Sequence, residues 1–327
     1  MKLRRVLSGL FGVLVITSSV AAPHAAAEAC RWIAHDLPVP PGAKNVEIRA
    51  SSGDNTLIVG WHGYRGLVWW NGDLWQMDEP PHGASTNVIP WGINNSAVVV
   101  GGLETYPDGG GLDRRAFRYQ YGQYQLLQTA SDEQSVALGV NDNGDVVGEV
   151  WKEPNIDWRT VVVWPANGPR KDFERGDAVG ISSDGKVVAN TRLAGDRIGW
   201  VKDINTGVKT TFQGPFRPMR LDNDRILYSE GISGGGDRIV EQGLDGQRVA
   251  TYADGTHVFG RTSSGTVFGA VSSGVAHLWQ WGTHYAVDAE KLPSAWYYGD
   301  VTDGGGLVGT YMDADGGRHP ARWFWCA

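Results

Sequence analysis

The chain has 327 residues, of which 41% are hydrophobic and 20% charged, and its formal net charge at pH 7 is −7. An acidic chain is not drawn in bulk to nucleic acid or to anionic membranes, so we expect neither partner. Beyond the N-terminal segment, no stretch is long and apolar enough to span a bilayer.

Residues 1–27 predict a secretory signal peptide. Lys2, Arg4 and Arg5 precede an apolar run over residues 6–16, and residues 25–27 are alanines at the positions that a signal peptidase reads. Cleavage after Ala27 would remove three cations and change the net charge from −7 to −10. The arginine pair leaves twin-arginine export open as an alternative to general secretion. We therefore expect a soluble, secreted, extracellular protein.

A unit of similar length recurs seven times along the rest of the chain, and its clearest copy covers residues 140–148. Each copy is a polar turn followed by a short apolar strand that ends in a small residue. The copies end at Gly60, Gly101, Gly148, Ala189, Ser229, Gly269 and Gly309, at spacings of 41, 47, 41, 40, 40 and 40 residues. A fixed period near 40 residues predicts a repeat architecture.

Each repeat contains signals for four short strands. The turn between the first two begins with a residue such as Asn94, Asn141 or Ser182, whose side chain can accept a hydrogen bond from the backbone two residues on. An aromatic-rich third strand follows a loop of variable length, and a second tight turn such as Asn71-Gly72 leads to the fourth. We therefore predict an all-β, seven-bladed propeller of four-stranded blades, with residues 28–327 as one domain.

The two ends of the chain complete one blade. The last repeat stops at Ala327 before its fourth strand, whereas residues 30–37 precede the first repeat and resemble an orphan fourth strand. Pairing them closes the ring and leaves no half-blade edge. Cys30 and Cys326 then face each other on adjacent strands, and an exported protein meets an oxidising environment, so we expect a disulfide. Two unpaired buried thiols are the alternative.

The repeat resembles a known family. The pattern Ala-x-Gly-Ile-Asn-x-x-Gly-x-Val-Val-Gly, followed by an aromatic strand ending in Trp, is similar to the HAF repeats of bacterial extracellular proteins. Its best copies are residues 137–148 and 178–189. The resemblance covers essentially the whole mature chain. It implies propeller-type repeats and brings no established activity or catalytic residues.

Connections in an antiparallel blade alternate between two faces. The short turns share one face, here called the turn face; the loops joining second to third strands, and each blade to the next, share the other, the loop face. The loops of blades two and three are the longest, and ligand sites favour such loops. In blade three, Trp151 and Trp158 flank Glu153 and Asp157. We expect these four residues to bind a sugar or peptide, with packing of the indoles on their own blade as the alternative.

Carboxylates offer weak candidates for catalysis. Glu149 and Glu230 follow the aligned small residue of their repeats, and with Asp157 they could perform acid and base chemistry if they met in one site. No spacing rule brings them together, so solvated or structurally paired side chains are the preferred interpretation.

Other motifs give no metal or cofactor prediction. Residues 231–235 fit a nucleophile-elbow pattern without a following helix. The segments 141–145 and 313–316 are similar to calcium loops but lack the later Glu, and the His residues show no metal-ligand spacing. We expect no cofactor and no metal.

The sequence favours a secreted, monomeric propeller that binds an extracellular glycan or protein without catalysis. One alternative is a glycan-acting hydrolase or lyase with carboxylates on the loop face. Another is a structural or inhibitory partner of a second secreted protein, which would show a flat apolar patch. Convergence of the three candidate carboxylates in a central depression would favour the enzyme.

Overall fold

The computed structural model describes residues 31–325, apart from 55, 81–85, 108–110, 155–157, 194–195, 213–216, 223, 232–236, 281–282, 290 and 292–298. The chain divides into two units, Met1–Cys30 and Arg31–Ala327, and every described residue belongs to the second. In this described part no helix is long and apolar enough to cross a bilayer.

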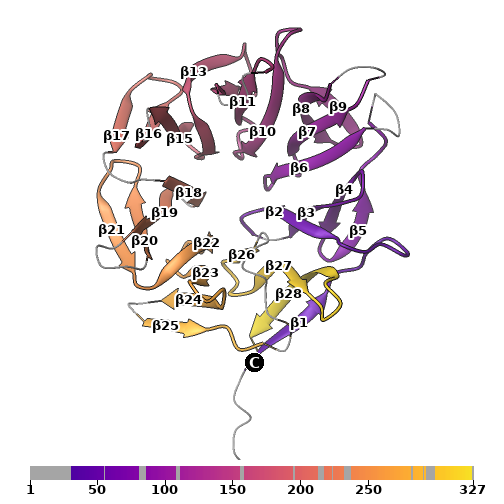
Figure 1. Cartoon of the computed structure of the whole chain (residues 1–327), viewed down its shortest axis with the longest axis vertical. Helices are drawn as coiled ribbons and strands as arrows, with labels where there is room; N and C mark the ends of the chain where they lie inside the picture. Colours follow the sequence, from indigo (N-terminus) through magenta and orange to yellow (C-terminus); the bar gives the residue numbers. More distant parts are fainter. Residues whose placement is uncertain are drawn as a thin grey trace, which may run out of the picture. The chain divides into compact units, whose positions relative to one another are not determined.

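The second unit is a ring of seven four-stranded antiparallel sheets, which confirms the predicted seven-bladed propeller (Figure 1). In blades 1 to 3 the strands, from the axis outward, are β2 (Glu47–Ser51), β3 (Leu57–His62), β4 (Arg65–Trp70) and β5 (Asp73–Gln76); β6 (Asn87–Ile93), β7 (Val99–Thr105), β8 (Asp113–Gln120) and β9 (Gln123–Leu126); β10 (Gln134–Val140), β11 (Val146–Trp151), β12 (Thr160–Trp164) and β13 (Lys171–Arg175).

Blades 4 to 7 repeat the same order. Their strands are β14 (Asp177–Ile181), β15 (Lys186–Leu193), β16 (Asp196–Asp203) and β17 (Lys209–Phe212); β18 (Arg217–Asp222), β19 (Arg225–Gly231), β20 (Asp237–Gly243) and β21 (Arg248–Tyr252); β22 (Gly255–Arg261), β23 (Val267–Val271), β24 (Ala276–Gln280) and β25 (Thr283–Ala286); β26 (Gly299–Val301), β27 (Leu307–Met312), β28 (Arg318–Trp325) and β1 (Trp32–Asp36).

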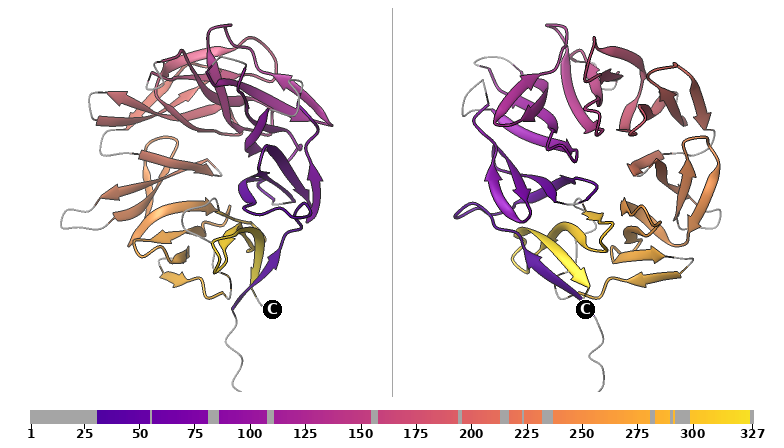
Figure 2. Two further views of the ribbon diagram at one scale, coloured as in Figure 1. Left: turned by 45° about the vertical axis from the view of Figure 1, so that its right-hand side comes forward. Right: turned by 180° about the vertical axis from the view of Figure 1, so that it is seen from behind.

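The N-terminal strand closes the ring, as predicted. β1 pairs antiparallel with β28, from Trp32 opposite Trp325 to Asp36 opposite Ala321. In both views of Figure 2 the indigo first strand runs beside the yellow last strand. Cys30 and Cys326 lie outside the described residues, so their disulfide stays a prediction.

Side chains in the tight turns also tie neighbouring blades together. Asn141 Oδ1 accepts a hydrogen bond of 2.9 Å from the Asp145 N–H, and Ser182 Oγ accepts one of 2.8 Å from the Lys186 N–H. These donors lie four residues on, whereas Asn94 Oδ1 accepts both from Ser96 N–H, two residues on as expected, at 3.0 Å and from Val98 N–H, four residues on, at 2.9 Å. Asn94 Nδ2 donates to the Asn141 carbonyl at 2.8 Å, and Asn141 Nδ2 to the Ser182 carbonyl at 3.0 Å. The turn residues therefore also link blades 2, 3 and 4.

The recurring Gly and the aromatic third strand have one explanation. A Cβ on Gly148 would come within 2.9 Å of the Trp164 ring and would collide with the carbonyl of β10. The Trp164 indole in turn donates at 2.7 Å to the carbonyl of Gln128, in the loop that enters the same blade. Trp69 repeats this arrangement in blade 1, with 2.8 Å to the Pro38 carbonyl. The small residue therefore makes room for an indole that anchors the connecting loop.

The hydrophobic core is divided among the interfaces between blades. Among the described residues, buried hydrophobic side chains form seven clusters, and each one joins two neighbouring blades. Val100 of blade 2, for example, packs with Val162 of blade 3. Each blade therefore depends on its neighbours for burial, as in other repeat proteins.

Candidate functional site

The predicted loop of blade 3 contains one buried and one exposed indole. Trp151 is only 3% exposed, and its indole N–H donates to Glu153 at 3.2 Å. The guanidinium groups of Arg114 and Arg159 lie 5.6 and 5.2 Å from its ring. The expectation that Trp151 offers an exposed face is therefore wrong, because its ring packs between two arginines.

Trp158 differs from Trp151, because it is 58% exposed and the Arg175 guanidinium lies 4.3 Å above its ring. Glu153 is exposed as well. Asp157, the fourth predicted residue, lies outside the described residues. The structure therefore keeps Trp158 and Glu153 available on this loop and removes Trp151 from the proposed platform.

Glu149 joins two blades. Its side chain is 2% exposed, accepts a hydrogen bond of 2.9 Å from the Ala178 N–H of blade 4, and pairs with Arg159 at 2.8 Å. Burial raises the pKa of Glu149, although the hydrogen bond from Arg159 opposes the rise. The equivalent residue of blade 7, Thr310, accepts a hydrogen bond of 3.0 Å from the Ile48 N–H of blade 1. A neutral hydroxyl thus fills the same structural role as the Glu149 carboxylate.

Glu230 is also paired. It contacts Arg238 at 2.5 Å and Arg248 at 2.9 Å within blade 5. Although burial acts to raise the pKa of Glu230, the hydrogen bonds from these two arginines outweigh it and leave the pKa lowered. Neither Glu230 nor Glu149 lines the central cavity described below. Among the described residues, the candidate carboxylates therefore do not converge in a central site.

A groove with exposed aromatic side chains lies between blades 6 and 7 on the turn face. Its volume is about 660 Å³, and its base includes the buried Trp32 and Val301. Tyr285 of β25 and Trp325 of β28 are 58% and 53% exposed. The Trp325 ring meets Trp32 edge to face, with 5.5 Å between the ring centroids. Two exposed ring systems therefore border one groove.

Polar groups of the same groove are acceptors or neutral. Asp288 and Asp303 are exposed carboxylates, and Gln280 and Ser264 add an amide and a hydroxyl. Among the described residues, the lining contains no Lys or Arg. Asp303 also accepts a hydrogen bond of 2.5 Å from the Ser263 N–H, which fixes the wall against blade 6. The groove therefore suits a ligand that offers hydroxyl or amine donors beside an apolar surface.

A second cavity, of about 510 Å³, lies on the propeller axis and is lined by the innermost strands of all seven blades. In six of those strands the pairing register shifts by one residue, which is a β-bulge. The extra residue in β2 is Arg49 and in β6 it is Trp91, and both line the cavity. Leu138 and Val179 occupy the same place in blades 3 and 4. The bulges therefore direct one side chain from each of blades 1 to 4 toward the axis.

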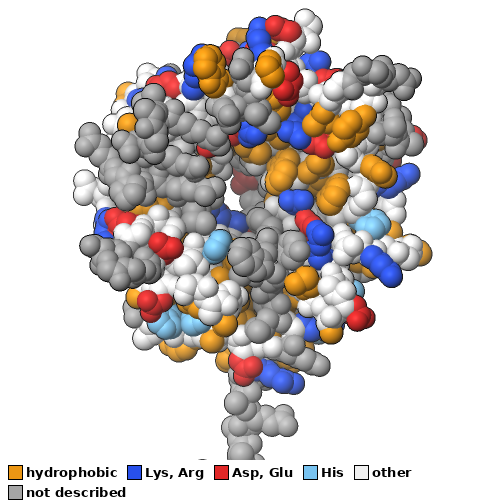
Figure 3. Space-filling view, in the orientation of Figure 1, with side chains coloured by type: hydrophobic (Ala, Val, Ile, Leu, Met, Phe, Trp, Pro, Cys, Tyr) orange, Lys and Arg blue, Asp and Glu red, His pale blue; other side chains and the backbone are white. Residues whose placement is uncertain are grey.

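Figure 3 views the loop face. Hydrophobic side chains gather over β6 and its neighbours beside the central opening, and Lys or Arg side chains border the opening itself.

One wall of the central cavity carries a polar network that spans blades 5, 7 and 1. Arg220 pairs with Asp222 at 2.5 Å and with Asp300 at 2.7 Å, and Ser51 Oγ donates to Asp300 at 2.5 Å. Burial raises the pKa of Asp222 to about 6, with Asp300 adding to the rise and Arg220 opposing it. The network holds the last blades to the first. In the described part of the chain no group of three His, Cys, Asp or Glu side chains is placed to hold a metal ion.

Comparison with known proteins supports the fold. No protein-family model and no curated protein matches the chain. Among solved structures, the β-propeller domain of the Trilobed protease from Pyrococcus furiosus is similar with a TM-score of 0.62 at 11% identity, over 86% of this chain and 93% of that one. That domain has an open velcro topology, whereas β1 here completes blade 7.

A puromycin-hydrolyzing peptidase from Mycobacterium tuberculosis is also similar, with a TM-score of 0.60 at 14% identity. The match covers 88% of this chain and 53% of the peptidase. The Dos1 propeller gives a TM-score of 0.51 at 9% identity. Similarity at these identities establishes the propeller fold and no activity.

Sequence reasoning did not find the groove or the bulge residues. The groove combines blade 6 with both ends of the chain, so no single repeat contains its pattern. The bulge residues had a usable signal: Trp91 and Leu138 each stand between a small residue or proline and a glycine, at a position that varies while its neighbours stay similar. A residue that varies between repeats, inside a motif that does not, is expected where the side chain takes no part in the packing that all blades share.

Proposed function

We propose that this chain is a secreted propeller of the HAF-repeat type that binds a neutral saccharide without catalysis, at the groove between blades 6 and 7. The observation that carries the proposal is the pair of exposed rings, Tyr285 and Trp325, on a groove whose described lining includes Asp288 and Asp303 and no Lys or Arg. An aromatic face covers the apolar face of a sugar ring, while carboxylates accept its hydroxyl protons.

The charge of the protein supports a neutral ligand over an anionic one. The formal net charge is −7, and anionic polysaccharides would be repelled from a groove that itself carries two carboxylates. Binding without chemistry is supported by the pairing of Glu149 and Glu230 within and between blades, which leaves both carboxylates committed to arginines. A glycan-acting hydrolase or lyase stays the alternative.

A glycan array with the mature protein, followed by calorimetric titration of the best neutral glycan, tests the proposal. Replacing Trp325 by alanine removes a ring from the groove and should weaken binding by roughly 1 kcal/mol or more. Trp75→Ala is the matched control, because Trp75 is equally exposed on β5 outside the groove. Its affinity should equal that of the wild type.

The loop of blade 3 is the competing site. Should affinity survive replacement of both Tyr285 and Trp325 but fall in a Trp158→Ala variant, the saccharide site lies on the loop face and the groove assignment is wrong. A new reducing end formed on incubation with the bound glycan would instead favour the hydrolase.

A further inference from the structure

A guanidinium group is held between two indole rings beside the propeller axis. Arg49, the bulge residue of β2, lies 4.8 Å from the Trp91 ring and 5.8 Å from the Trp61 ring. It also pairs with Glu47 at 2.9 Å. Stacking and pairing fix a long, flexible side chain in one position, which is the arrangement that a recognition arginine requires.

Two hydrogen-bond donors of this cluster are buried without an acceptor. The Nε–H of Arg49 and the indole N–H of Trp61 have no hydrogen-bond partner in the structure. Burial lowers the pKa of Arg49, which remains a cation in neutral solution. Buried donors are almost always satisfied, so the unpaired N–H groups of Arg49 and Trp61 indicate a missing acceptor.

The charge of the cluster indicates that this acceptor is an anion. Glu47 is buried and contacts two guanidinium groups, those of Arg49 and Arg318. Arg49 therefore has one carboxylate partner, which it shares with Arg318. Arg220, the other arginine in the described lining, contacts two carboxylates, Asp222 and Asp300, in the network that reaches from blade 5 to blades 7 and 1. Of these two arginines, Arg49 is the less compensated.

The rest of the cavity combines apolar walls with the polar network around Arg220. Its walls include Leu138, Val179, Leu221 and Phe259, and the Trp91 ring, 36% exposed, forms part of its rim. Such walls offer few partners to the hydroxyls of a sugar acid, but they accept a hydrocarbon or aromatic body. The volume of about 510 Å³ suits a small molecule or the last residue of a peptide.

We propose that the axial cavity binds a small carboxylate with an apolar body, with Arg49 as the partner of the carboxylate and Trp91 as the platform for the body. Arginine recognises carboxylates through paired N–H donors, and those hydrogen bonds are stronger in a site shielded from water. This site is separate from the groove between blades 6 and 7, since the two share no lining residue.

The test compares an acid with its amide. N-Acetylphenylalanine carries a carboxylate beside an aromatic body, and N-acetylphenylalaninamide is its neutral analogue. Calorimetric titration of the wild-type protein should show the acid binding about tenfold or more tightly than the amide, which is the usual range for a charge-assisted hydrogen bond. Glucuronate, a carboxylate with a hydroxyl-rich body, should bind more weakly than N-acetylphenylalanine.

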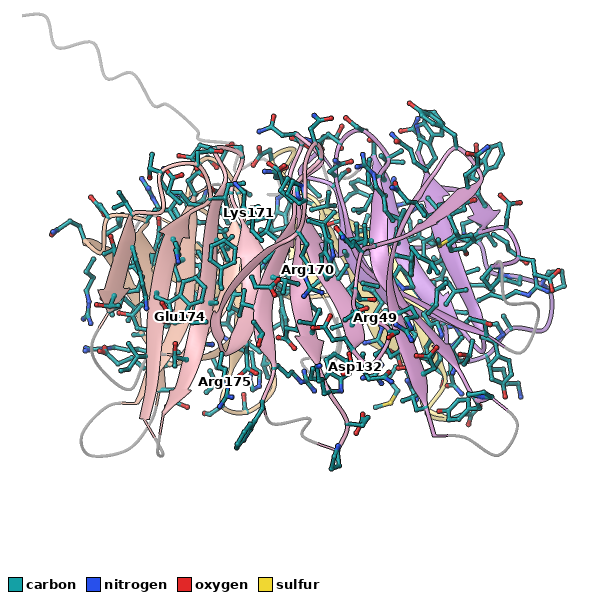
Figure 4. The ribbon with its side chains drawn as sticks, turned by 90° about the horizontal axis from the view of Figure 1, so that it is seen from above. Arg49, Asp132, Arg170, Lys171, Glu174 and Arg175 are labelled. Atoms are coloured by element: carbon teal, nitrogen blue, oxygen red, sulfur yellow. The ribbon has the colours of Figure 1, made fainter. Side chains whose placement is uncertain are left out.

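Variants assign the effect to Arg49. Arg49→Gln should lower the affinity for the acid about tenfold and leave that for the amide unchanged, while Arg49→Lys should fall between. Arg175→Gln is the matched control, because Arg175 also stacks on an indole, that of Trp158, but outside the cavity. Figure 4 labels both arginines. The control should bind as the wild type does.

Trp91→Ala keeps the charge of Arg49 and removes the platform, so it should lower the affinity for the acid and for the amide alike. This variant replaces Arg49→Gln as the test if Arg49→Gln does not fold. Several results would overturn the proposal: no binding of the acid by the wild type at about 10 mM, equal affinity for acid and amide, or an Arg49→Gln variant that still prefers the acid. Tighter binding of glucuronate than of N-acetylphenylalanine would refute the prediction that the ligand has an apolar body.

Discussion

Replacing Glu149 by alanine should lower the melting temperature of the ring by several degrees. The Glu149 carboxylate is 2% exposed and accepts from Arg159 at 2.8 Å and from the Ala178 N–H at 2.9 Å. Removing the carboxylate leaves the Ala178 N–H without its acceptor and the Arg159 guanidinium without its ion-pair partner. Breaking a buried ion pair from one side costs about 3–5 kcal/mol.

The expected shift in melting temperature follows from the size of the domain. Unfolding entropy is about 2.1 cal/mol/K per residue, so a ring of roughly 300 residues has about 0.6 kcal/mol/K, and the loss corresponds to about 5–8 °C. Thr310→Val removes the equivalent neutral hydrogen bond to Ile48 and should cost less, about 1–3 kcal/mol or roughly 2–5 °C. Thermal unfolding followed by circular dichroism measures both variants.

The order of the two effects decides whether Glu149 is structural. A Glu149→Ala variant that melts within about 1 °C of the wild type, or above Thr310→Val, would refute the structural role. If Glu149→Gln kept its melting temperature but abolished a measured turnover of glycan, the hydrolase alternative would gain instead.

Three further predictions concern the axis, the chain ends and the repeat. Because burial raises the pKa of Asp222 from 3.8 to about 6, the folded protein binds a proton at this carboxylate more tightly than the unfolded chain does. The resulting stabilisation of the folded state is complete below pH 3.8 and is lost as the pH rises through about 6. Urea unfolding should show the wild type losing up to about 3 kcal/mol relative to Asp222→Asn between pH 4 and 7, and a constant difference would contradict this. Reduction should raise the intact mass by two hydrogens if Cys30 and Cys326 are bonded, and Cys30→Ala should lower the melting temperature; an unchanged mass excludes the bond. Gly148→Ala should cost about 1–3 kcal/mol because the added Cβ collides with backbone and indole, whereas Gly102→Ala, whose Cβ meets nothing nearer than 3.6 Å, should unfold close to the wild type.

The architecture could be predicted from the sequence because its determinants are local and repeated. Gly148 and Trp164 lie 16 residues apart in one blade and are explained by a contact within that blade. A small residue recurs near every 40 residues, and a Trp or Phe follows it in the third strand of six blades, so several weak signals support one interpretation. Closure by the N-terminal strand followed from counting strands, since one blade lacked its fourth.

The candidate site could not be predicted in the same way. Trp151 and Trp158 stand in the same loop region, and the alternation of hydrophobic residues does not separate them. Trp151 is buried because Arg114, from the neighbouring blade, stacks on it, and this contact has no trace in the local sequence. Arg49 likewise has the sequence pattern of an exposed strand residue, and only the register shift in β2 directs its side chain toward the axis.

The bulges on the innermost strands separate the chemistry of the axis from the stability of the ring. Arg49, Trp91, Leu138 and Val179 each fall between paired positions, so none of them takes part in the register of its blade. Arg49, Trp91 and Leu138 belong to none of the seven clusters between blades, so exchanging one of them leaves the clusters unchanged, whereas Val179 packs against the cluster of blades 4 and 5. The side chains that face the axis can thus be changed without changing the pairing of the strands. A combinatorial library at these positions would alter binding specificity one blade at a time while the propeller kept its fold.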